Sequence, residues 1–390
     1  MTSRPSDHIA FDRPWVTISL DNLVRNVALV RNRLPPDVPV MAVVKDRAYG
    51  LGAVHVARVL EAGGIEWFAV AHTGEARELR AAGITSPILV FGEAGPEDLR
   101  WGAQNRIRFA LNSLDSLNRW VATDTTVTFH CNIDTGMTRL GLLPSAIGTL
   151  TEAVAEYGNL RMEGVFTHYA SADEPGTDSV ARQQTIFHEA LSTLHAAGFA
   201  RLLIHSFNSA AVAGFPLPQR DSLVRPGILL YGCTPDPLRD FQVKPHPVVS
   251  LHAPVVRVRE IDPGTPVSYG GTWVASRHTR LATVAVGYGC GYPRALSNRG
   301  RLLIGGVAYP IVGRVTMDYT MVDIGPEGSV EIGDEAVALG PQGRECIEAD
   351  EIARLCGTIG YEVLAGLGGS LDRYYFFEGR RYGIMTGTQY

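Results

Sequence analysis

The chain has 390 residues and a net charge of −5, with 45% hydrophobic and 19% charged residues. This length suits two domains, or one large barrel with a smaller unit. The acidic balance and the lack of a Lys/Arg-rich tract exclude nucleic acid as an expected partner. No apolar run approaches transmembrane length, and residues 1–7 lack the apolar core of a signal peptide, so we expect no membrane association.

Cysteine usage points to a reducing compartment. The five cysteines are odd in number and scattered, and none belongs to a CxxC pair. This pattern fits the cytoplasm and argues against a zinc cluster, so we expect a cytoplasmic protein without a metal site. The cysteines are Cys131, Cys233, Cys290, Cys346 and Cys356.

From about residue 38 to residue 232, short apolar or β-branched runs alternate with amphipathic helical stretches. Eight such runs predict an α/β fold of the (β/α)8 TIM-barrel type more than an open, doubly wound sheet. No GxGxxG or Walker-type loop follows a run, which counts against a nucleotide-binding sheet. The runs are Val38–Lys45, Trp67–Ala71, Pro87–Phe91, Arg108–Asn112, Thr126–Asp134, Met162–His168, Arg201–Phe207 and Leu223–Tyr231.

After Gly232 the sequence pattern changes, and Pro235 to Pro247 resembles a connector. From Val248 to about Tyr382, strand-like runs are separated by turn signals rather than by helices. This predicts a mostly β domain with one helix near Ala349–Cys356. We therefore expect an N-terminal arm at residues 1–12, a barrel at residues 13–240 and a C-terminal β domain at residues 241–390.

Polar residues follow several of the predicted strands, at the end where barrel enzymes carry their active residues. Taken singly, His168 also fits a satisfied core histidine, and Asn208-Ser209 fits a helix cap. Together they are harder to explain by packing, because they converge on one mouth of the predicted barrel. The set comprises Lys45, Tyr49, Asn132, Asp134, Arg139, His168, His205, Asn208, Ser209, Arg225, Gly227 and Ile228.

Lys45 ends the first apolar strand and precedes a Gly-rich turn. Only two of the 35 basic residues are lysines, Lys45 and Lys244. Arginine cannot replace a lysine nucleophile or base because its pKa is above about 12, whereas a lysine can be desolvated to a neutral amine. The alternative interpretation is a surface lysine, since genomic base composition also explains why lysine is rare.

Loops after the seventh and eighth strands of such barrels often bind phosphate. Ser209, Gly227 and Ile228 can offer a hydroxyl and backbone N–H groups, and Tyr49 can offer a phenol. A phosphate there, with a lysine on the first strand, indicates pyridoxal phosphate (PLP) held as a Schiff base by Lys45. Arg225 would then face the pyridine nitrogen and would make the ring a weaker electron sink than an acid would.

At these residues the chain resembles the bacterial alanine racemases, over nearly its whole length. Each motif is modestly specific, whereas their order along the chain is highly specific. The motifs are Val44-Lys45…Ala48-Tyr49-Gly50…Gly52, Asp134-Thr-Gly-Met-Thr-Arg139-Leu-Gly141, Thr167-His168, Asn208-Ser209, Arg225-Pro-Gly227-Ile228…Tyr231-Gly232, Val267-Ser-Tyr269-Gly270-Gly-Thr272, Val286-Gly-Tyr288…Gly291-Tyr292 and Ile311-Val-Gly-Arg314…Met317-Asp318.

The resemblance implies PLP-dependent interconversion of L- and D-alanine by two bases, Lys45 and Tyr269, on opposite faces of the substrate. Tyr269 would come from the partner subunit of a head-to-tail homodimer with shared active sites. Arg225 would bind the pyridine nitrogen, His168 would pack on the ring, and Arg139 would reach its phenolic oxygen. The cofactor set implied is Lys45, Tyr49, Arg139, His168, Asn208, Ser209, Arg225, Gly227 and Ile228, and the substrate set is Arg139, Tyr288, Met317 and Asp318.

The chain departs from the family pattern at several positions. Asn132 stands where many members carry a carbamylated lysine, so Arg139 would rely on a bound anion or on neutral hydrogen bonds. Asp46-Arg47 replaces the usual residues after the lysine, Cys290 replaces a usual Asp, and Gly369 replaces a larger side chain. These changes leave the catalytic set intact but put strict alanine specificity in doubt.

Three other functions fit parts of the sequence. A broader amino-acid racemase, acting for example on serine, is the nearest. A PLP decarboxylase of the same architecture would pair the pyridine nitrogen with an acid and would lack Val267-Ser-Tyr269-Gly, so Arg225 and Tyr269 argue against it. A PLP-binding regulatory barrel would lack the second domain.

Overall fold

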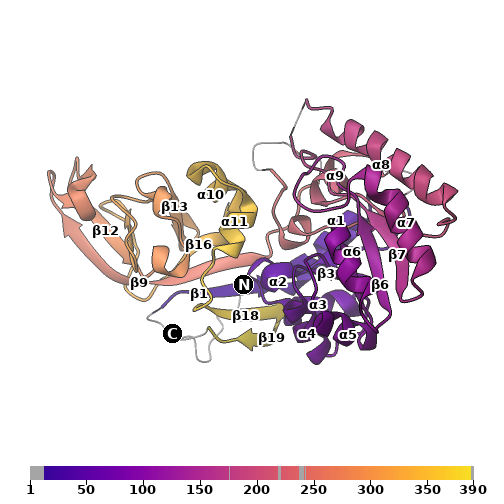
Figure 1. Cartoon of the computed structure of the whole chain (residues 1–390). Helices are drawn as coiled ribbons and strands as arrows, with labels where there is room; N and C mark the ends of the chain where they lie inside the picture. The colour runs from indigo at the N-terminus through magenta and orange to yellow at the C-terminus, as the bar shows by residue number, and fades with distance from the viewer. Residues whose placement is uncertain (1–12, 175, 218–220, 237–240, 242, 388–390) are drawn as a thin grey trace. The chain divides into compact units, whose positions relative to one another are not determined.

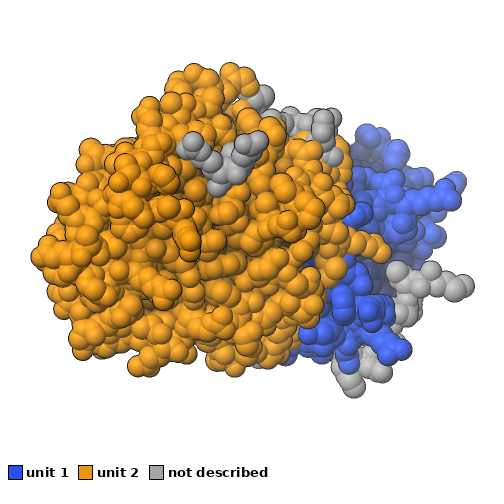
Figure 2. Space-filling view, turned by 90° about the vertical axis from the view of Figure 1, so that its right-hand side faces the viewer, with its two compact units in different colours: residues 1–23, 231–233, 246–390 blue, residues 24–230, 234–245 orange. Residues whose placement is uncertain are grey.

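The computed structural model describes residues 13–174, 176–217, 221–236, 241 and 243–387. The chain forms two compact units. We call residues 24–230 and 234–245 the barrel unit, and residues 1–23, 231–233 and 246–390 the β unit; Figure 2 colours them orange and blue. No helix in the described part of the chain is long and apolar enough to cross a membrane.

The barrel unit contains a seven-stranded parallel sheet in the order β2-β3-β4-β5-β6-β7-β8, with helices between successive strands (Figure 1). Strands β2 and β4 are buried throughout, as expected for parallel strands covered on both faces. The strands are β2 (Met41–Val43), β3 (Trp67–Val70), β4 (Ile88–Val90), β5 (Ile107–Leu111), β6 (Val127–Asn132), β7 (Leu160–Phe166) and β8 (Leu203–His205). The helices are α2 (Lys45–Tyr49), α3 (Ala53–Ala62), α4 (Thr73–Ala81), α5 (Pro96–Gln104), α6 (Leu114–Val121), η1 (Pro144–Ala146), α7 (Ile147–Glu156), α8 (Ser179–Ala196), α9 (Ser209–Gly214) and η2 (Ile228–Tyr231), and α1 (Leu20–Arg31) precedes them.

The segment after Ser222 closes the sheet into a barrel. Val224 bridges to Val40 ahead of β2, and Arg225 bridges to Asn208 beyond β8, both in the parallel sense. The predicted (β/α)8 barrel is therefore confirmed, but the expected eighth strand, Leu223–Tyr231, is wrong in its second half. Pro226 has no N–H to continue the ladder, and the chain turns into the 3₁₀ helix η2.

The β unit is built on a ten-stranded sheet, whose main path runs β14-β13-β16-β9-β1-β18-β19. The 13-residue strand β9 pairs with β1, β12 and β16. The strands are β1 (Trp15–Ser19), β9 (Val249–Ile261), β12 (Thr279–Val284), β13 (Arg301–Ile304), β14 (Val307–Pro310), β15 (Thr320–Asp323), β16 (Glu335–Gln342), β17 (Glu345–Ile347), β18 (Asp372–Phe377) and β19 (Arg380–Met385), with β10 (Pro266–Val267) and β11 (Trp273–Val274) as a separate pair.

Short helices join the strands of this unit. Helix α10 (Ala349–Cys356) has the bounds expected from the sequence, whereas α11 (Gly360–Ala365) was not predicted. The 3₁₀ turns are η3 (Tyr269–Gly271), η4 (Tyr288–Cys290) and η5 (Arg294–Leu296).

The expected boundaries of 13–240 and 241–390 do not coincide with the two compact units. Strand β1 forms its ladders with β9 and β18, so residues 13–23 belong to the β unit, whereas residues 24–40 ahead of β2 belong to the barrel unit. Residues 231–233 belong to the β unit too, whereas 234–245 belong to the barrel unit. The expected arm at 1–12 lies outside the described residues.

Candidate active site at the barrel mouth

Lys45 begins a turn of left-handed backbone. The next four residues, Asp46 to Tyr49, all have φ between 52° and 56°, and Gly50 closes the turn at φ 87°. A left-handed conformation costs an L-residue about 1–2 kcal/mol, because its Cβ approaches the following carbonyl oxygen. Four such residues in succession persist only where surrounding contacts hold them, and such sites cluster around active residues.

The Lys45 side chain is 39% exposed, and its Nζ lies 3.8 Å from a carboxylate oxygen of Asp46. The Val44 N–H just before it donates to the Ala69 carbonyl of the next strand, at 2.9 Å. The backbone that leads to Lys45 is therefore part of the barrel ladder, while the amine itself remains accessible.

Tyr49, Ser209 and Gly227 meet around the first turn of η2. Ser209 Oγ accepts the Gly227 N–H at 2.8 Å, so its own proton is available to another acceptor. A Cβ at position 227 would lie 2.3 Å from the Tyr49 hydroxyl, so only glycine fits there. The N–H of Ile228, the first residue of η2, cannot be used within that helix. Burial and the nearby Asp46 raise the pKa of Tyr49, which keeps its phenol a neutral donor.

Asn208 caps the helix that carries Ser209. Its Oδ1 accepts the Ala211 N–H at 3.0 Å, so the capping interpretation is confirmed. Its Nδ2 also reaches the Tyr169 carbonyl at 3.4 Å. The cap thus fixes α9, and with α9 the position of the Ser209 hydroxyl.

Arg225 is only 3% exposed, and four carbonyl or ring acceptors hold its two terminal nitrogens. Nη1 donates to Nδ1 and to the carbonyl of His205 at 2.8 and 2.6 Å. Nη2 donates to the Thr167 and Ser206 carbonyls at 2.8 and 3.3 Å. The remaining donor of Arg225 is its Nε–H, which has no hydrogen-bond acceptor among the described residues. Burial lowers the pKa of Arg225 to about 10, so it remains a cation at neutral pH.

Behind Arg225, buried polar side chains form a chain of hydrogen bonds that the sequence did not predict. Because Arg225 only donates, His205 accepts through Nδ1 and donates through Nε2 to His130 Nδ1, at 2.7 Å. His130 Nε2 lies 3.4 Å from the Glu163 carboxylate, which Arg108 binds with two bonds at 2.6 and 2.8 Å.

The protonation of this chain is set by burial and by its cations. Burial, then nearby Arg225, lowers the pKa of His205, and burial also lowers the pKa of His130. Burial acts to raise the pKa of Glu163, but hydrogen bonds from Arg108 and His130 outweigh it and lower the pKa to about 2. At neutral pH both rings are therefore neutral and the carboxylate is charged. The sequence does carry a signal for these buried groups, because polar residues recur at every second position inside the barrel strands.

His168 lies among three cations at the same mouth. The pKa of His168 is lowered to about 3. Burial is the largest cause, and the positive charges of Arg225, Arg139 and Lys45 add to it. His168 is therefore a neutral ring, and its carbonyl accepts a hydrogen bond from Gln183. Because the charges of Arg225, Arg139 and Lys45 all act on His168, these four side chains lie near one another at the barrel mouth.

This depressed pKa predicts a pH-dependent stability. The unfolded chain binds the proton near the ordinary pKa of 6.5, whereas the folded chain binds it near 3. Stability present above pH 6.5 is therefore lost as the pH falls toward 3, by about 1 kcal/mol from this residue at pH 5.5. In urea unfolding, His168→Gln should lose less stability between pH 7 and 5.5 than the parent does. An identical loss in both proteins would contradict the assignment.

Asn132 is tied to the barrel interior rather than to Arg139. Its Nδ2 donates to Asn112 Oδ1 at 2.9 Å, and Asn112 Nδ2 donates to the Phe91 carbonyl at 2.9 Å. Arg139 lies exposed in the following loop, in which Asp134 accepts the Gly136 and Thr138 N–H groups. A neutral amide thus stands at the position where the family often has a charged group.

The remaining predicted residues belong to the β unit. Tyr269 is 70% exposed, Met317 55% and Tyr288 42%. The Tyr288 and Gly289 N–H groups donate to the Thr316 and Met317 carbonyls at 3.0 and 2.8 Å, so these two loops lie together. Asp318 is exposed on the same loop as Met317.

Backbone strain also borders Tyr269. Ser268 has φ 63° and ψ −174°, a region almost restricted to glycine. Its hydroxyl donates to the Arg314 carbonyl at 2.7 Å, and Gly313 lies so close that a Cβ there would meet Ser268 Cβ at 2.8 Å. The turn that presents Tyr269 is thus held by the neighbouring Gly313-Arg314 segment.

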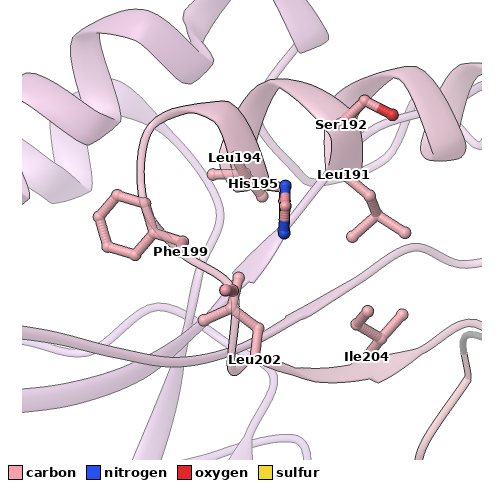
Figure 3. A pocket seen from close by; sticks show the side chains of 8 residues that line it. Leu191, Ser192, Leu194, His195, Phe199, Leu202 and Ile204 are labelled. Atoms are coloured by element: carbon pink, nitrogen blue, oxygen red, sulfur yellow. The ribbon is translucent and has the colours of Figure 1, made fainter.

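One pocket, of about 320 Å³, lies between α8 and β8 (Figure 3). None of the predicted site residues lines it, and Leu202 places it at the start of β8, the opposite end of that strand from Asn208. Its lining is mostly apolar and consists of Leu191, Ser192, Leu194, His195, Phe199, Ala200, Leu202 and Ile204.

Comparison with known proteins accounts for nearly the whole chain. A family model for the alanine racemase N-terminal domain matches residues 18–235, and one for the C-terminal domain matches residues 248–375. Alanine racemase of Syntrophobacter fumaroxidans is 40% identical over 358 residues, which cover 91% of this chain and 95% of that relative. Alanine racemase of Cutibacterium acnes is also 40% identical, over 92% of this chain and 96% of its own.

Solved structures agree with the sequence relatives. The crystal structure of alanine racemase from Bacillus anthracis with bound L-Ala-P is 33% identical and superposes with a TM-score of 0.88, covering 97% of this chain and 99% of that chain. Alanine racemase from D-cycloserine-producing Streptomyces lavendulae is 34% identical, with a TM-score of 0.86 over 95% of this chain and 98% of that one.

A closed (β/α)8 barrel with a lysine at its mouth, joined to a mostly β unit, defines a two-domain barrel enzyme. Both family models match in order, and curated relatives align over nine-tenths of the chain. The chain belongs to the alanine racemase family, whose members are PLP-dependent isomerases.

Proposed function

We propose that this protein interconverts L- and D-alanine with PLP as cofactor, in the cytoplasm, and works as a homodimer with shared active sites. The observation that carries the proposal is the meeting of Lys45, His168, Arg139 and Arg225 at one barrel mouth. Family membership at 40% identity supports alanine as the substrate.

The donors at this mouth fit PLP. Tyr49, Ser209, the Gly227 cradle and the Ile228 N–H would hold the phosphate, and Lys45 would hold the aldehyde carbon covalently. The Arg225 Nε–H is directed by its four other bonds and would donate to the pyridine nitrogen. When bound, PLP supplies an electron sink that allows an α-proton to leave the substrate.

Arg225 limits the strength of that sink. An arginine donates a hydrogen bond without protonating the ring nitrogen, because its pKa of about 10 is far above that of a pyridine. The neutral His205 and His130 behind it offer no proton of their own at neutral pH. A moderate sink suits the removal and return of one α-proton, and discourages decarboxylation.

Racemisation needs one base on each face of the substrate, because a proton lost from one face must return to the other. Lys45 would serve one face from the barrel unit. Tyr269 would serve the other face from the β unit of the partner subunit, with Tyr288, Met317 and Asp318 bordering the substrate. The high exposure of Tyr269, Tyr288 and Met317 in the single chain supports an interface at this surface.

The range of amino acids that the site accepts would depend on the positions where the chain departs from the family pattern. Cys290 is buried, and its thiol donates to the Gly287 carbonyl, so an uncharged group stands where an Asp is usual. Gly369 is exposed and adds no side chain. Both changes favour a site that tolerates a hydroxymethyl side chain, so L-serine is the second substrate to test.

The proposal is tested by chiral analysis of the products from a panel of L-amino acids with added PLP. We expect D-alanine as the main product, with D-serine formed about tenfold to a hundredfold more slowly, since an apolar pocket rejects an added hydroxyl by only about 10²-fold. Release of CO₂ in place of the D-enantiomer would instead indicate a decarboxylase, and absence of any turnover would favour a regulatory PLP barrel.

A further inference from the structure

Glu75 on α4 ties two loops of the barrel mouth together. Its Oε1 accepts the Asp46 N–H at 2.5 Å, immediately after Lys45. Its Oε2 accepts the Ala71 and His72 N–H groups at 2.8 and 3.1 Å, in the loop that follows β3. One carboxylate therefore uses both oxygens and joins the loop after the first barrel strand to the loop after the second.

The anchored N–H has a direct geometric link to Lys45. The Asp46 N–H and the Lys45 carbonyl belong to the same planar peptide unit, so a fixed N–H direction fixes the ψ angle of Lys45. The ψ angle describes rotation about the bond from the Lys45 Cα to its carbonyl carbon, and the Lys45 side chain is attached to that same Cα. A carboxylate accepting a backbone N–H forms a charge-assisted bond, which is stronger than a neutral one.

The same N–H also opens the left-handed turn. Asp46 is the first of four successive non-glycine residues with positive φ. Within the turn, Ala48 N–H donates to the Val44 carbonyl and Gly50 N–H donates to the Asp46 carbonyl. These bonds close the turn internally, whereas Glu75 ties its start to a different strand-loop unit.

We propose that Glu75 is a positioning residue for Lys45: its carboxylate sets the backbone direction at the Lys45–Asp46 peptide and so holds the amine where it attaches to PLP and receives the α-proton. This inference rests on the proposed function. An ordinary helix cap on α4 would require only the His72 and Ala71 contacts, and the Asp46 contact goes beyond it.

Glu61 provides a matched control. It lies on α3, and its Oε1 accepts the backbone N–H groups of Thr85 and Ser86 at 2.8 and 2.7 Å, together with both of their hydroxyls. It therefore performs the same kind of loop anchoring ahead of β4, away from the Lys45 turn. Glu61→Gln should lose as much loop anchoring as Glu75→Gln without disturbing the Lys45–Asp46 peptide.

The experiment compares Glu75→Gln and Glu61→Gln with the parent protein. In the apoprotein, we expect the peptide spanning residues 44–52 to exchange its amide hydrogens about tenfold faster in Glu75→Gln alone, since its anchored N–H is released. On addition of PLP, the rate of covalent attachment to Lys45, trapped with borohydride and read by mass spectrometry, should fall about tenfold. We also expect kcat to fall similarly while KM for alanine changes less than about twofold.

The outcomes separate the two proposals. If Glu75→Gln attaches PLP and turns over alanine at the parent rates, Glu75 is a structural cap only and the inference is overturned. Equal losses in Glu75→Gln and Glu61→Gln would also overturn it, because general loosening would then explain them. If the parent protein itself attaches no PLP, the proposed function fails independently of either variant.

Discussion

Lys45→Ala is expected to abolish covalent attachment of PLP and to reduce racemisation of alanine by about 10³-fold or more, since both the covalent link and one base are lost. The side chain is 39% exposed, and among the described residues its ion pair is with Asp46, so the substitution should leave the fold intact. The change is measured by the visible absorbance of the PLP-loaded protein and by polarimetry from both enantiomers.

The composition of the chain makes this test unusually clean. Lys244 is the only other lysine, and it is exposed in the segment after Pro235. Borohydride trapping followed by peptide mapping therefore has two candidate side chains. We expect Lys244→Ala to retain the label and full activity. A label that persists in Lys45→Ala and disappears in Lys244→Ala would refute Lys45 as the PLP lysine.

The barrel could be predicted from the sequence because its strands and helices have clear periods. Seven of the eight expected runs overlap observed strands, and the eighth bridges both ends of the sheet at Val224 and Arg225. The assignment of β1 could not be predicted. Trp15–Ser19 is a short apolar run like the barrel strands, and only its ladders with β9 and β18, far along the chain, place it in the β unit.

The candidate site was predictable where chemistry coincides with strand ends. Lys45, His168, Asn208 and Arg225 follow this rule, since parallel strands of a barrel present their carboxyl ends at one mouth. The supporting groups do not follow it. Glu163 lies within β7, and its role depends on His130 and Arg108 across neighbouring strands.

The left-handed turn at Asp46–Tyr49 was hidden for a different reason. Positive φ is expected at glycine, and this segment has none before Gly50. The conformation is held by tertiary contacts such as Glu75 to the Asp46 N–H, which no local pattern encodes. The predictable part of the site is thus its chemistry, and the unpredictable part is what orients that chemistry.

Tyr269→Phe is expected to lower racemisation by about 10²–10⁴-fold, because it removes one proton-transfer group and leaves the ring in place. L- and D-alanine have equal free energies, so kcat/KM must fall equally in both directions. The asymmetry appears instead in solvent exchange: in D₂O, the enantiomer whose α-proton faces Lys45 should exchange without inverting, while the other should not. Exchange of both enantiomers at one rate would contradict the two-base assignment.

Tyr382→Phe is the matched control, since Tyr382 is an exposed tyrosine of the same unit, at 45% exposure, outside the predicted site. We expect it to keep full activity. The origin of Tyr269 in the partner subunit is tested by mixing Lys45→Ala with Tyr269→Phe after reversible dissociation. Each variant alone should retain about 1% of the parent activity or less, but a mixed dimer of shared sites contains one doubly altered site and one intact site. Random pairing should therefore restore about a quarter of the parent activity, whereas sites built within single chains would restore none.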